Sequence, residues 1–255
     1  TPPTPFYTPP TPLPQGLPGT VIKAEPMPDA PPGIKATRIM YLSSSADGKP
    51  TAVTGMIAEP DGPTPGFGRP LVAFAHGTTG TARPCAVSID PFSNNTTGTH
   101  MWEARIRPLV NQGYVVTAAD YEGEGAPGAP VYMLKNTQAF NVLDSIRAAI
   151  YQEPQHIDAS KVAIYGHSQG GHASLSAASL APEYAPELQI RGAVASAPGM
   201  IPPIPLALQE MTAEPGTPQE ASIRAAYVLN IVASWSTAFP DELKPSDLLT
   251  PEGEK

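Results

Sequence analysis

Short apolar runs alternate with amphipathic stretches through the middle of this chain. Continuously apolar runs, the pattern of strands buried on both faces of a parallel sheet, occupy residues 71–75, 114–119 and 162–165. Stretches of helical length and periodicity lie between and after them, at residues 102–112, 137–152 and 174–180. With a further strand expected at residues 191–196, this alternation predicts an α/β domain with a mostly parallel sheet flanked by helices.

The amino-terminal part has a different texture. Residues 37–43 and 51–58 are strand-like and are joined through Asp47-Gly48, which predicts a β-hairpin. Residues 1–33 are so rich in proline that helix and central strand are excluded, leaving an extended arm. The pattern does not decide between a disordered leader and an arm that packs on the domain through Phe6, Tyr7, Leu13 and Leu17.

The strand–helix alternation stops after Pro198. Two apolar helical stretches follow at residues 206–211 and 220–238, and their periodicity fits a helical cap over the sheet edge as well as ordinary core helices. These stretches follow the sixth strand of the expected sheet, and their position favours the cap, because folds of this kind carry a cap over the active site at that point. We therefore expect three parts: a Pro-rich arm at 1–33, a partial core at 34–198 and the start of a helical cap or lid at 199–255.

Composition narrows the possible partners. The net charge is -8, only 15% of residues are charged, and Lys and Arg form no cluster, so we expect no nucleic-acid binding and a neutral substrate. No apolar run reaches the roughly 20 residues that span a bilayer. The Pro-rich, Lys-poor chain starts at Thr1, which predicts a secreted or cell-envelope protein whose signal peptide has been removed, a trimmed chain being the alternative.

One motif carries candidate chemistry. Gly166-His167-Ser168-Gln169-Gly170 is a weak signal by itself, but here it follows an apolar strand and opens a helix rich in small residues. That context predicts a tight strand–turn–helix elbow with Ser168 as the nucleophile of a serine hydrolase of α/β-hydrolase fold. The alternative is a serine in a Gly-rich turn without chemistry.

A nucleophilic serine also needs donors for the oxyanion. The backbone N–H of Gln169, at the amino end of the new helix, is the first expected donor. The second is expected from residues 76–80, which follow the strand at 71–75, with Thr79 preferred and Thr78 as second choice. A simple turn is the alternative for this segment.

The remaining polar residues near the motif receive weaker assignments. His167 and His172 sit on the elbow and its helix and cannot reach the serine oxygen as a base, so both are expected to be structural. Asp120, Glu122 and Glu124 end a strand at the edge where open α/β sheets bind ligands, although capping of loops is the favoured role. We expect no metal, because His and carboxylates show no ligand spacing, and no cofactor.

The partners of Ser168 are missing from the sequence. The fold supplies an acid and then a histidine after the serine, yet only His172 follows, and Asp241 and Asp247 lie in a polar, Pro-containing stretch. The triad cannot be completed within residues 1–255. Either the protein is a binding module that lost its base, or a longer polypeptide carries the last strands with Asp and His.

Three observations favour the longer polypeptide. One strand signal follows the elbow where the sheet usually has two more, and Cys85 is the single cysteine. Thr250-Pro251-Glu252 is a helix-start signature close to the end of the sequence. We therefore expect the carboxy-terminal remainder, as the same chain or a second one, to supply both triad residues.

Several segments resemble the secretory lipases, the family represented by Candida antarctica lipase A, in an actinobacterial version. The similar segments are Phe6-Tyr7-Thr8-Pro9, Gln112-Gly113-Tyr114-Val115-Val116, Asp120-Tyr121-Glu122-Gly123, the elbow with His172-Ala173, and residues 179–188. Residues 179–188 are distinctive, because generic hydrolase chemistry does not require them.

The resemblance implies an α/β-hydrolase core with a helical cap, acting on carboxylic esters. It places the nucleophile at Ser168 and the oxyanion amides at Gln169 and Thr79, where the fungal relative has an aspartate. It also implies a disulfide from Cys85 to a cysteine beyond the cap. We expect an acyl-enzyme on Ser168 formed from apolar esters such as acylglycerols. The alternatives are a non-catalytic lipid-binding protein and an esterase or acyltransferase for small polar or polyester substrates.

Overall fold

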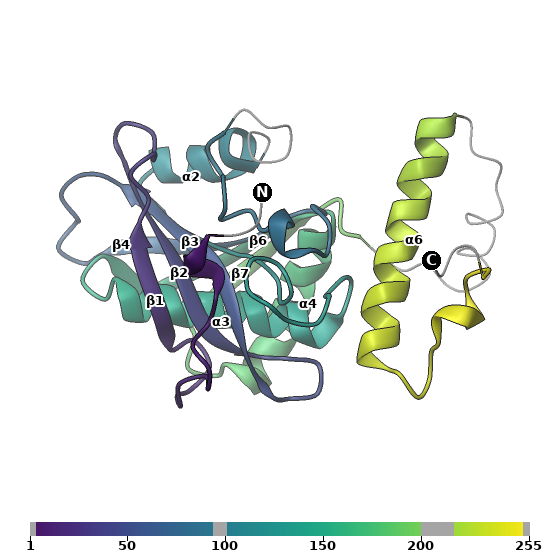
Figure 1. The fold of residues 1–255 in the computed structure, drawn as a ribbon. Helices are drawn as coiled ribbons and strands as arrows, with labels where there is room; N and C mark the ends of the chain where they lie inside the picture. The colour runs from purple at the N-terminus through teal and green to yellow at the C-terminus, as the bar shows by residue number, and fades with distance from the viewer. Residues whose placement is uncertain (1–3, 94–100, 200–216, 252–255) are drawn as a thin grey trace.

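The computed structural model describes residues 4–93, 101–199 and 217–251. Its centre is one mixed sheet with the strand order β1-β2-β3-β5-β4-β6-β7 (Figure 1). The strands are β1 Val21–Pro26, β2 Ile34–Ser44, β3 Pro50–Pro60, β4 Arg69–Ala75, β5 Val115–Ala119, β6 Ile157–His167 and β7 Ile190–Ser196. Strands β5, β4, β6 and β7 are mutually parallel, whereas β1, β2 and β3 join by antiparallel pairing. The predicted helix-flanked α/β sheet is confirmed.

The helices follow the predicted order. They are α2 Arg107–Asn111, α3 Lys135–Gln152, α4 Gln169–Tyr184 and α6 Pro218–Ala238, with a π-helical turn η3 Trp102–Ile106 before α2 and short 3₁₀ turns η1 Pro5–Tyr7, η2 Arg83–Cys85 and η4 Pro245–Asp247. The stretch predicted as one helix at 102–112 is thus split. Pro108 has no N–H for an i→i−4 bond, so the helix ladder changes at this point. The helix predicted at 206–211 lies outside the described residues.

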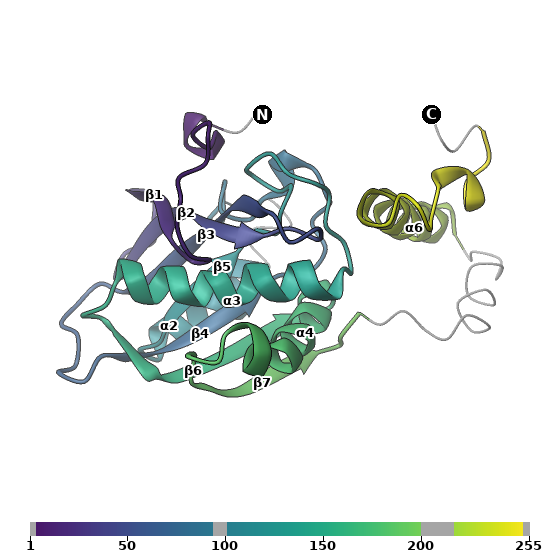
Figure 2. The same cartoon turned by 90° about the horizontal axis from the view of Figure 1, so that it is seen from below.

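The two faces of the sheet are covered by different helices. On β5, Val115 packs toward α3 and α4, while Val116 packs toward Trp102 and Ile106 beside α2. Successive strand residues point to opposite faces, so a continuously apolar strand feeds two separate cores. Figure 2 shows α3 lying across one face of the sheet. This double burial explains why these strands read as unbroken apolar runs.

The predicted hairpin is confirmed. β2 pairs with β3 in one unbroken register from Ile34 opposite Pro60 to Ser44 opposite Pro50. Gly48 has φ +77°, a conformation that favours glycine, and its N–H donates to the carbonyl of Ser45 at 3.0 Å. The turn chemistry of Asp47-Gly48 therefore fixed the register.

The proline-rich arm is more structured than its composition predicts. It contributes the edge strand β1, which the pattern of residues 1–33 did not predict and which fills their proline-poor stretch. Tyr7 is fully buried and Phe6 nearly so, whereas Leu17 is 74% exposed. Since the Tyr7 hydroxyl also lies 2.9 Å from Ser88 Oγ, the described part of the arm packs on the domain.

Helix α6 stands at one end of the core, beside the carboxyl edge of the parallel strands (Figure 1). Val232 and Ser234 are its buried residues, and Trp235 packs against the core that contains α3 and α4. Within the described ranges, no helix combines the length and apolar character needed to cross a bilayer. The division into arm, core and cap stays a prediction.

Candidate active site

Ser168 lies at a sharp turn between β6 and α4. It is the N-cap residue of α4 and has φ +56° and ψ −118°, a conformation that L-amino acids rarely adopt. Its N–H donates to the carbonyl of Ser196 at 3.0 Å, and its carbonyl accepts the N–H of Gly199 at 2.8 Å. Backbone hydrogen bonds to the segment around the end of β7 thus hold the strained residue in place.

The glycines flanking Ser168 leave no space for a side chain. A Cβ on Gly166 would collide with the carbonyl of Gly170, and one on Gly170 would collide with the carbonyl of Ala75 at the end of β4. Helix α4 therefore begins in direct backbone contact with two parallel strands. Gln169 is its first residue and is 1% exposed, and the first N–H groups of a helix lack intrahelical partners.

The segment after β4 lies against this elbow. A Cβ on Gly77 would come within 3.3 Å of the carbonyl oxygen of His167 and 3.7 Å of Ser168 Cβ. We call residues 77–81 the 77–81 loop. Its Thr78 hydroxyl lies 3.0 Å from the hydroxyl of Tyr132, while the Thr79 hydroxyl is buried and interacts with the carboxyl of Glu124. The structure thus brings together the nucleophile candidate and the loop expected to bear the second oxyanion donor.

Below the 77–81 loop, His76 and Glu124 form a buried pair. Their side chains are 0% and 1% exposed, and Nε2 of His76 lies 3.3 Å from Oε2 of Glu124. Nδ1 of His76 donates to the carbonyl of Gly77 at 2.7 Å, and Tyr121 donates to the carbonyl of His76 at 3.0 Å. The imidazole is therefore fixed on both sides, at the base of the loop.

Burial and the interaction between the two groups together set the protonation of this pair. Burial raises the pKa of Glu124 to about 7, although the neighbouring His76 opposes the rise. Burial alone would lower the pKa of His76, but the charge of Glu124 and hydrogen bonds to Glu124 and the Gly77 carbonyl raise it above its ordinary value. Because the pKa values of both groups are raised, the pair retains a proton near neutral pH.

Asp120 is the centre of a second buried polar cluster. It accepts the N–H of Ser88 at 3.0 Å and the hydroxyls of Ser88 and Thr54 at 2.5 and 2.7 Å. Burial raises the pKa of Asp120 despite these donors. It holds the loop at Ser88, as the capping prediction required, whereas Glu124 holds His76 and not a loop terminus.

The pairing of His76 with Glu124 had no sequence signal, because it joins two loops 48 positions apart.

No histidine in the described ranges hydrogen-bonds to the hydroxyl of Ser168. His172 lies one turn further along α4 and its Nδ1 is 3.2 Å from Oε1 of Gln138. Burial, followed by the charge of Lys135, lowers the pKa of His172. His167 is on β6, with its ring beside Gly77. Within the described residues, these contacts therefore bring neither a histidine base nor its carboxylate partner to the Ser168 hydroxyl.

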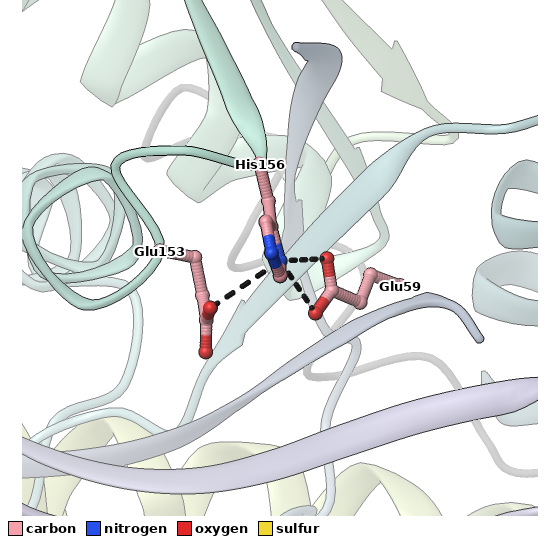
Figure 3. A group of neighbouring side chains, drawn as sticks. All are labelled: Glu59, Glu153 and His156. Carbon is pink, nitrogen blue, oxygen red and sulfur yellow. Dashed lines mark hydrogen bonds and ion pairs between the residues drawn. The ribbon is translucent and has the colours of Figure 1, made fainter. Parts of the chain in front are cut away.

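A third polar cluster lies away from the elbow, where β3 ends and β6 begins. His156 Nδ1 lies 2.9 Å from Oε2 of Glu59 and 3.4 Å from Oε2 of Glu153 (Figure 3). Two carboxylates and an imidazole within 4.8 Å of one another are a possible metal ligand set. Lys35, however, already places its ammonium 2.8 Å from Glu59 and 3.5 Å from Glu153. The lysine supplies the cation here, so the cluster is an ion-pair network.

Cys85 ends the short turn η2 and is a free, partly exposed thiol. A Cβ on Gly80 would lie only 2.6 Å from the Sγ of Cys85, so the thiol packs directly against this glycine. The thiol thus borders the 77–81 loop. The disulfide that the family resemblance implies is not present in the described structure.

The strand order, the strained serine at the start of α4 and the adjoining loop are those of an α/β-hydrolase core with a tight strand–turn–helix elbow. Residues 90–207 match the family model described as secretory lipase. Over these residues the chain is similar to the secretory lipases. A Mycobacterium tuberculosis protein named "Probable inactive lipase" is 31% identical over 215 residues, 76% of this chain and 45% of the relative. Lipase A of Arthroderma benhamiae is 31% identical over 227 residues, 81% and 46% of the two chains.

Solved structures agree on the fold. Candida antarctica lipase A in its closed state superposes with a TM-score of 0.73 at 24% identity, covering 93% of this chain and 53% of the lipase. The rice cell wall degrading esterase LipA from Xanthomonas oryzae gives 0.66 at 17% identity, over 94% and 66%. These similarities establish the α/β-hydrolase architecture alone. The chain spans less than half the length of the two curated relatives.

Proposed function

We propose that the protein is a carboxylic-ester hydrolase that works through an acyl-enzyme on Ser168. The observation that carries the proposal is the backbone of Ser168, held at φ +56° at the start of α4. Strain of this kind costs about 1–3 kcal/mol, persists only where the surrounding structure enforces it, and is found most often at functional sites. A partly exposed serine at a strand–turn–helix elbow is the arrangement that presents a nucleophile to an ester.

The reaction divides into two acyl transfers. Ser168 Oγ attacks the ester carbonyl carbon while its proton passes to a histidine, and the N–H groups of Gln169 and Thr79 hold the oxyanion, Thr78 being the second choice. The tetrahedral species collapses, and the histidine returns the proton to the departing alcohol. Water then attacks the acyl-enzyme in the same way and releases the carboxylic acid. The enzyme ends unchanged.

We place the histidine and its carboxylate outside the described residues. His167 and His172 are both committed to the elbow and α4, and His76 is buried against Glu124. We propose that the histidine and its carboxylate come from a carboxy-terminal part of a longer polypeptide, since this chain covers only 45% and 46% of its two curated relatives. The same part would supply a cysteine for Cys85 and complete an exported enzyme.

The substrates we propose are esters of apolar acyl groups, such as acylglycerols. Helix α6 carries Ile223, Tyr227 and Leu229, each 44–46% exposed, close to the carboxyl edge of the sheet. Apolar side chains on a cap are suited to an acyl chain. Esterase or acyltransferase activity on small polar or polyester substrates is the near alternative, since chain length depends on the complete acyl pocket.

A fluorophosphonate probe tests the nucleophile directly. The full-length protein is expected to gain one covalent adduct by intact-mass measurement, located by peptide mapping to Ser168, and to hydrolyse short p-nitrophenyl esters. Ser168→Ala should abolish both results. Ser222→Ala, on the exposed face of α6, is the matched control and should retain both.

The second candidate is a non-catalytic lipid-binding protein. The inactive designation of the M. tuberculosis relative favours it. This candidate predicts no adduct and no turnover in the full-length protein, together with retained binding of a fluorescent fatty acid in Ser168→Ala and wild type alike. An adduct on Ser168 would exclude it.

A further inference from the structure

One short segment lies between helix α6 and the 77–81 loop. Tyr132 donates its backbone N–H to the hydroxyl of Ser234 at 2.7 Å and accepts the indole N–H of Trp235 at its carbonyl, at 3.2 Å. Ser234 is fully buried. Both backbone groups of one residue are thus satisfied by side chains of the neighbouring helix, an arrangement that fixes its peptide planes.

The side chain of Tyr132 continues this connection toward the loop. Its hydroxyl lies 3.0 Å from Oγ1 of Thr78, and the residue is 6% exposed. Burial raises the pKa of Tyr132, although the bond to Thr78 opposes the rise, so the phenol keeps its proton at neutral pH. Ser234, Tyr132 and Thr78 therefore form a continuous path of polar contacts from α6 to the 77–81 loop.

The next residue connects the same segment to the elbow. Met133 has φ +55°, one of three non-glycine residues with positive φ in the described structure, the others being Ser168 and Ala197. The terminal methyl carbon of Met133 lies 3.1 Å from the position that a Cβ on Gly199 would take. The N–H of Gly199 holds the carbonyl of Ser168. The strained residues therefore surround one site, where strain is maintained by neighbouring contacts.

A second contact joins α6 to the loop independently of Tyr132. The hydroxyl of Thr81 donates to Oδ1 of Asn230 at 3.3 Å. Helix α6 thus holds the loop at its far end through Asn230 and near its start through Tyr132. Two anchors restrict the orientation of the intervening peptides, from which the second oxyanion N–H is expected.

We propose that Tyr132 is a positioning residue that transmits the docking of α6 to the 77–81 loop, so that the oxyanion donors are correctly oriented only when α6 is in place. The role in catalysis rests on the proposed function, whereas the mechanical connection does not. Tyr132 does not touch the reacting atoms in this assignment. It acts through Thr78.

Threonine methyl NMR on the full-length protein tests the connection without any need for activity. In Ser234→Ala, the methyl resonances of Thr78 and Thr79 should shift or broaden, while those of Thr37 and Thr51 in the β2–β3 hairpin stay unchanged. The effect at Thr78 should be largely lost when Ser234→Ala is made in a Tyr132→Phe background. Unchanged Thr78 and Thr79 resonances in Ser234→Ala would overturn the proposal.

Ester kinetics test the positioning role. Tyr132→Phe removes one hydroxyl from a partly buried hydrogen bond and should lower kcat roughly fivefold to tenfold while leaving KM essentially unchanged. Tyr151→Phe is the matched control, because Tyr151 is 56% exposed. A lower melting temperature with unchanged kcat would mean a purely structural role and would refute positioning. If wild type shows no turnover, the proposed function fails, and the NMR result still decides the connection.

Discussion

The imidazole of His76 faces the carboxylate of Glu124 across 3.3 Å, and both side chains are almost completely shielded from water. The pair stands at the base of the 77–81 loop, between the end of β4 and the turns that follow β5. Because the hydrogen bond from His76 to the Gly77 carbonyl fixes the first peptide of that loop, the protonation of this pair is linked to the stability of the candidate site.

Glu124→Gln should flatten the dependence of stability on pH. Glu124 has a pKa of about 7 in the folded protein against an ordinary value of 4.5, so the native state binds a proton that the unfolded chain releases. Its stabilising contribution is complete below about pH 4.5 and is lost as the pH rises to about 7. Glutamine cannot titrate. Urea unfolding at pH 5 and pH 8 should show a smaller loss of stability in the variant.

Glu103→Gln is the control for that measurement, since the Glu103 side chain is 47% exposed and pairs with Arg107 on the surface. It should retain the wild-type pH dependence. If Glu124→Gln and wild type lose the same free energy of unfolding between pH 5 and pH 8, the raised pKa of Glu124 is wrong.

Arg147→Leu should destabilise the protein more at pH 8 than at pH 5. Asp144 is fully buried and accepts from Arg147 at 2.8 Å, from Ser43 at 2.7 Å and from Tyr184 at 2.9 Å. Burial raises its pKa to about 6 even with these partners. Without the guanidinium the ionised form is disfavoured further, at a cost of about 2–3 kcal/mol, which protonation relieves at low pH.

The control for this prediction is Arg107→Leu. Arg107 and Glu103 form an exposed ion pair at 2.6 Å, and such pairs contribute about 0–1 kcal/mol. Chemical denaturation of both variants at the two pH values provides the comparison. If the two substitutions lower the free energy of unfolding by the same amount at both pH values, the ionised form of Asp144 does not depend on Arg147.

Ser168→Gly should be more stable than Ser168→Ala. Glycine accepts φ +56° without the strain of a Cβ, and relief of about 1–3 kcal/mol exceeds the added chain entropy of about 0.4–1 kcal/mol. At Ser222, which lies inside α6, Ser222→Ala should instead be more stable than Ser222→Gly, because glycine in a helix costs about 1 kcal/mol relative to alanine. Melting temperatures of the four variants test both orders, and an alanine variant more stable at both sites would contradict the strain.

Gly170→Ala should be severely destabilising, by about 3 kcal/mol or more, because its Cβ would meet the Ala75 carbonyl and neither backbone can move freely. Gly192→Ala offers a matched control in β7, where a Cβ meets nothing within 4 Å. That substitution should be neutral or stabilising by about 0.5–1 kcal/mol. Circular dichroism melts compare them, and similar melting temperatures would refute the close approach at the elbow.

Local chemistry made much of the fold readable from the sequence. The apolar runs of β4, β5 and β6 are unbroken because helices cover both sheet faces, and Asp47-Gly48 encodes the turn between β2 and β3. The elbow could also be predicted from the sequence, since glycines are required at Gly166 and Gly170, where the start of α4 meets the backbones of β6 and β4. The edge strand β1 was missed, because proline density dominates its surroundings and edge pairing leaves only a weak periodic signal.

The environment of Ser168 was decided by tertiary structure. The sequence by itself determined a serine between glycines at a strand–helix junction, because that motif depends on residues next to one another. Only the folded chain brings His76 to Glu124, and Thr78 to Tyr132 and onward to Ser234. These contacts join residues that are 48 to 102 positions apart, and no local periodicity encodes a pairing whose partners meet only after the sheet has formed.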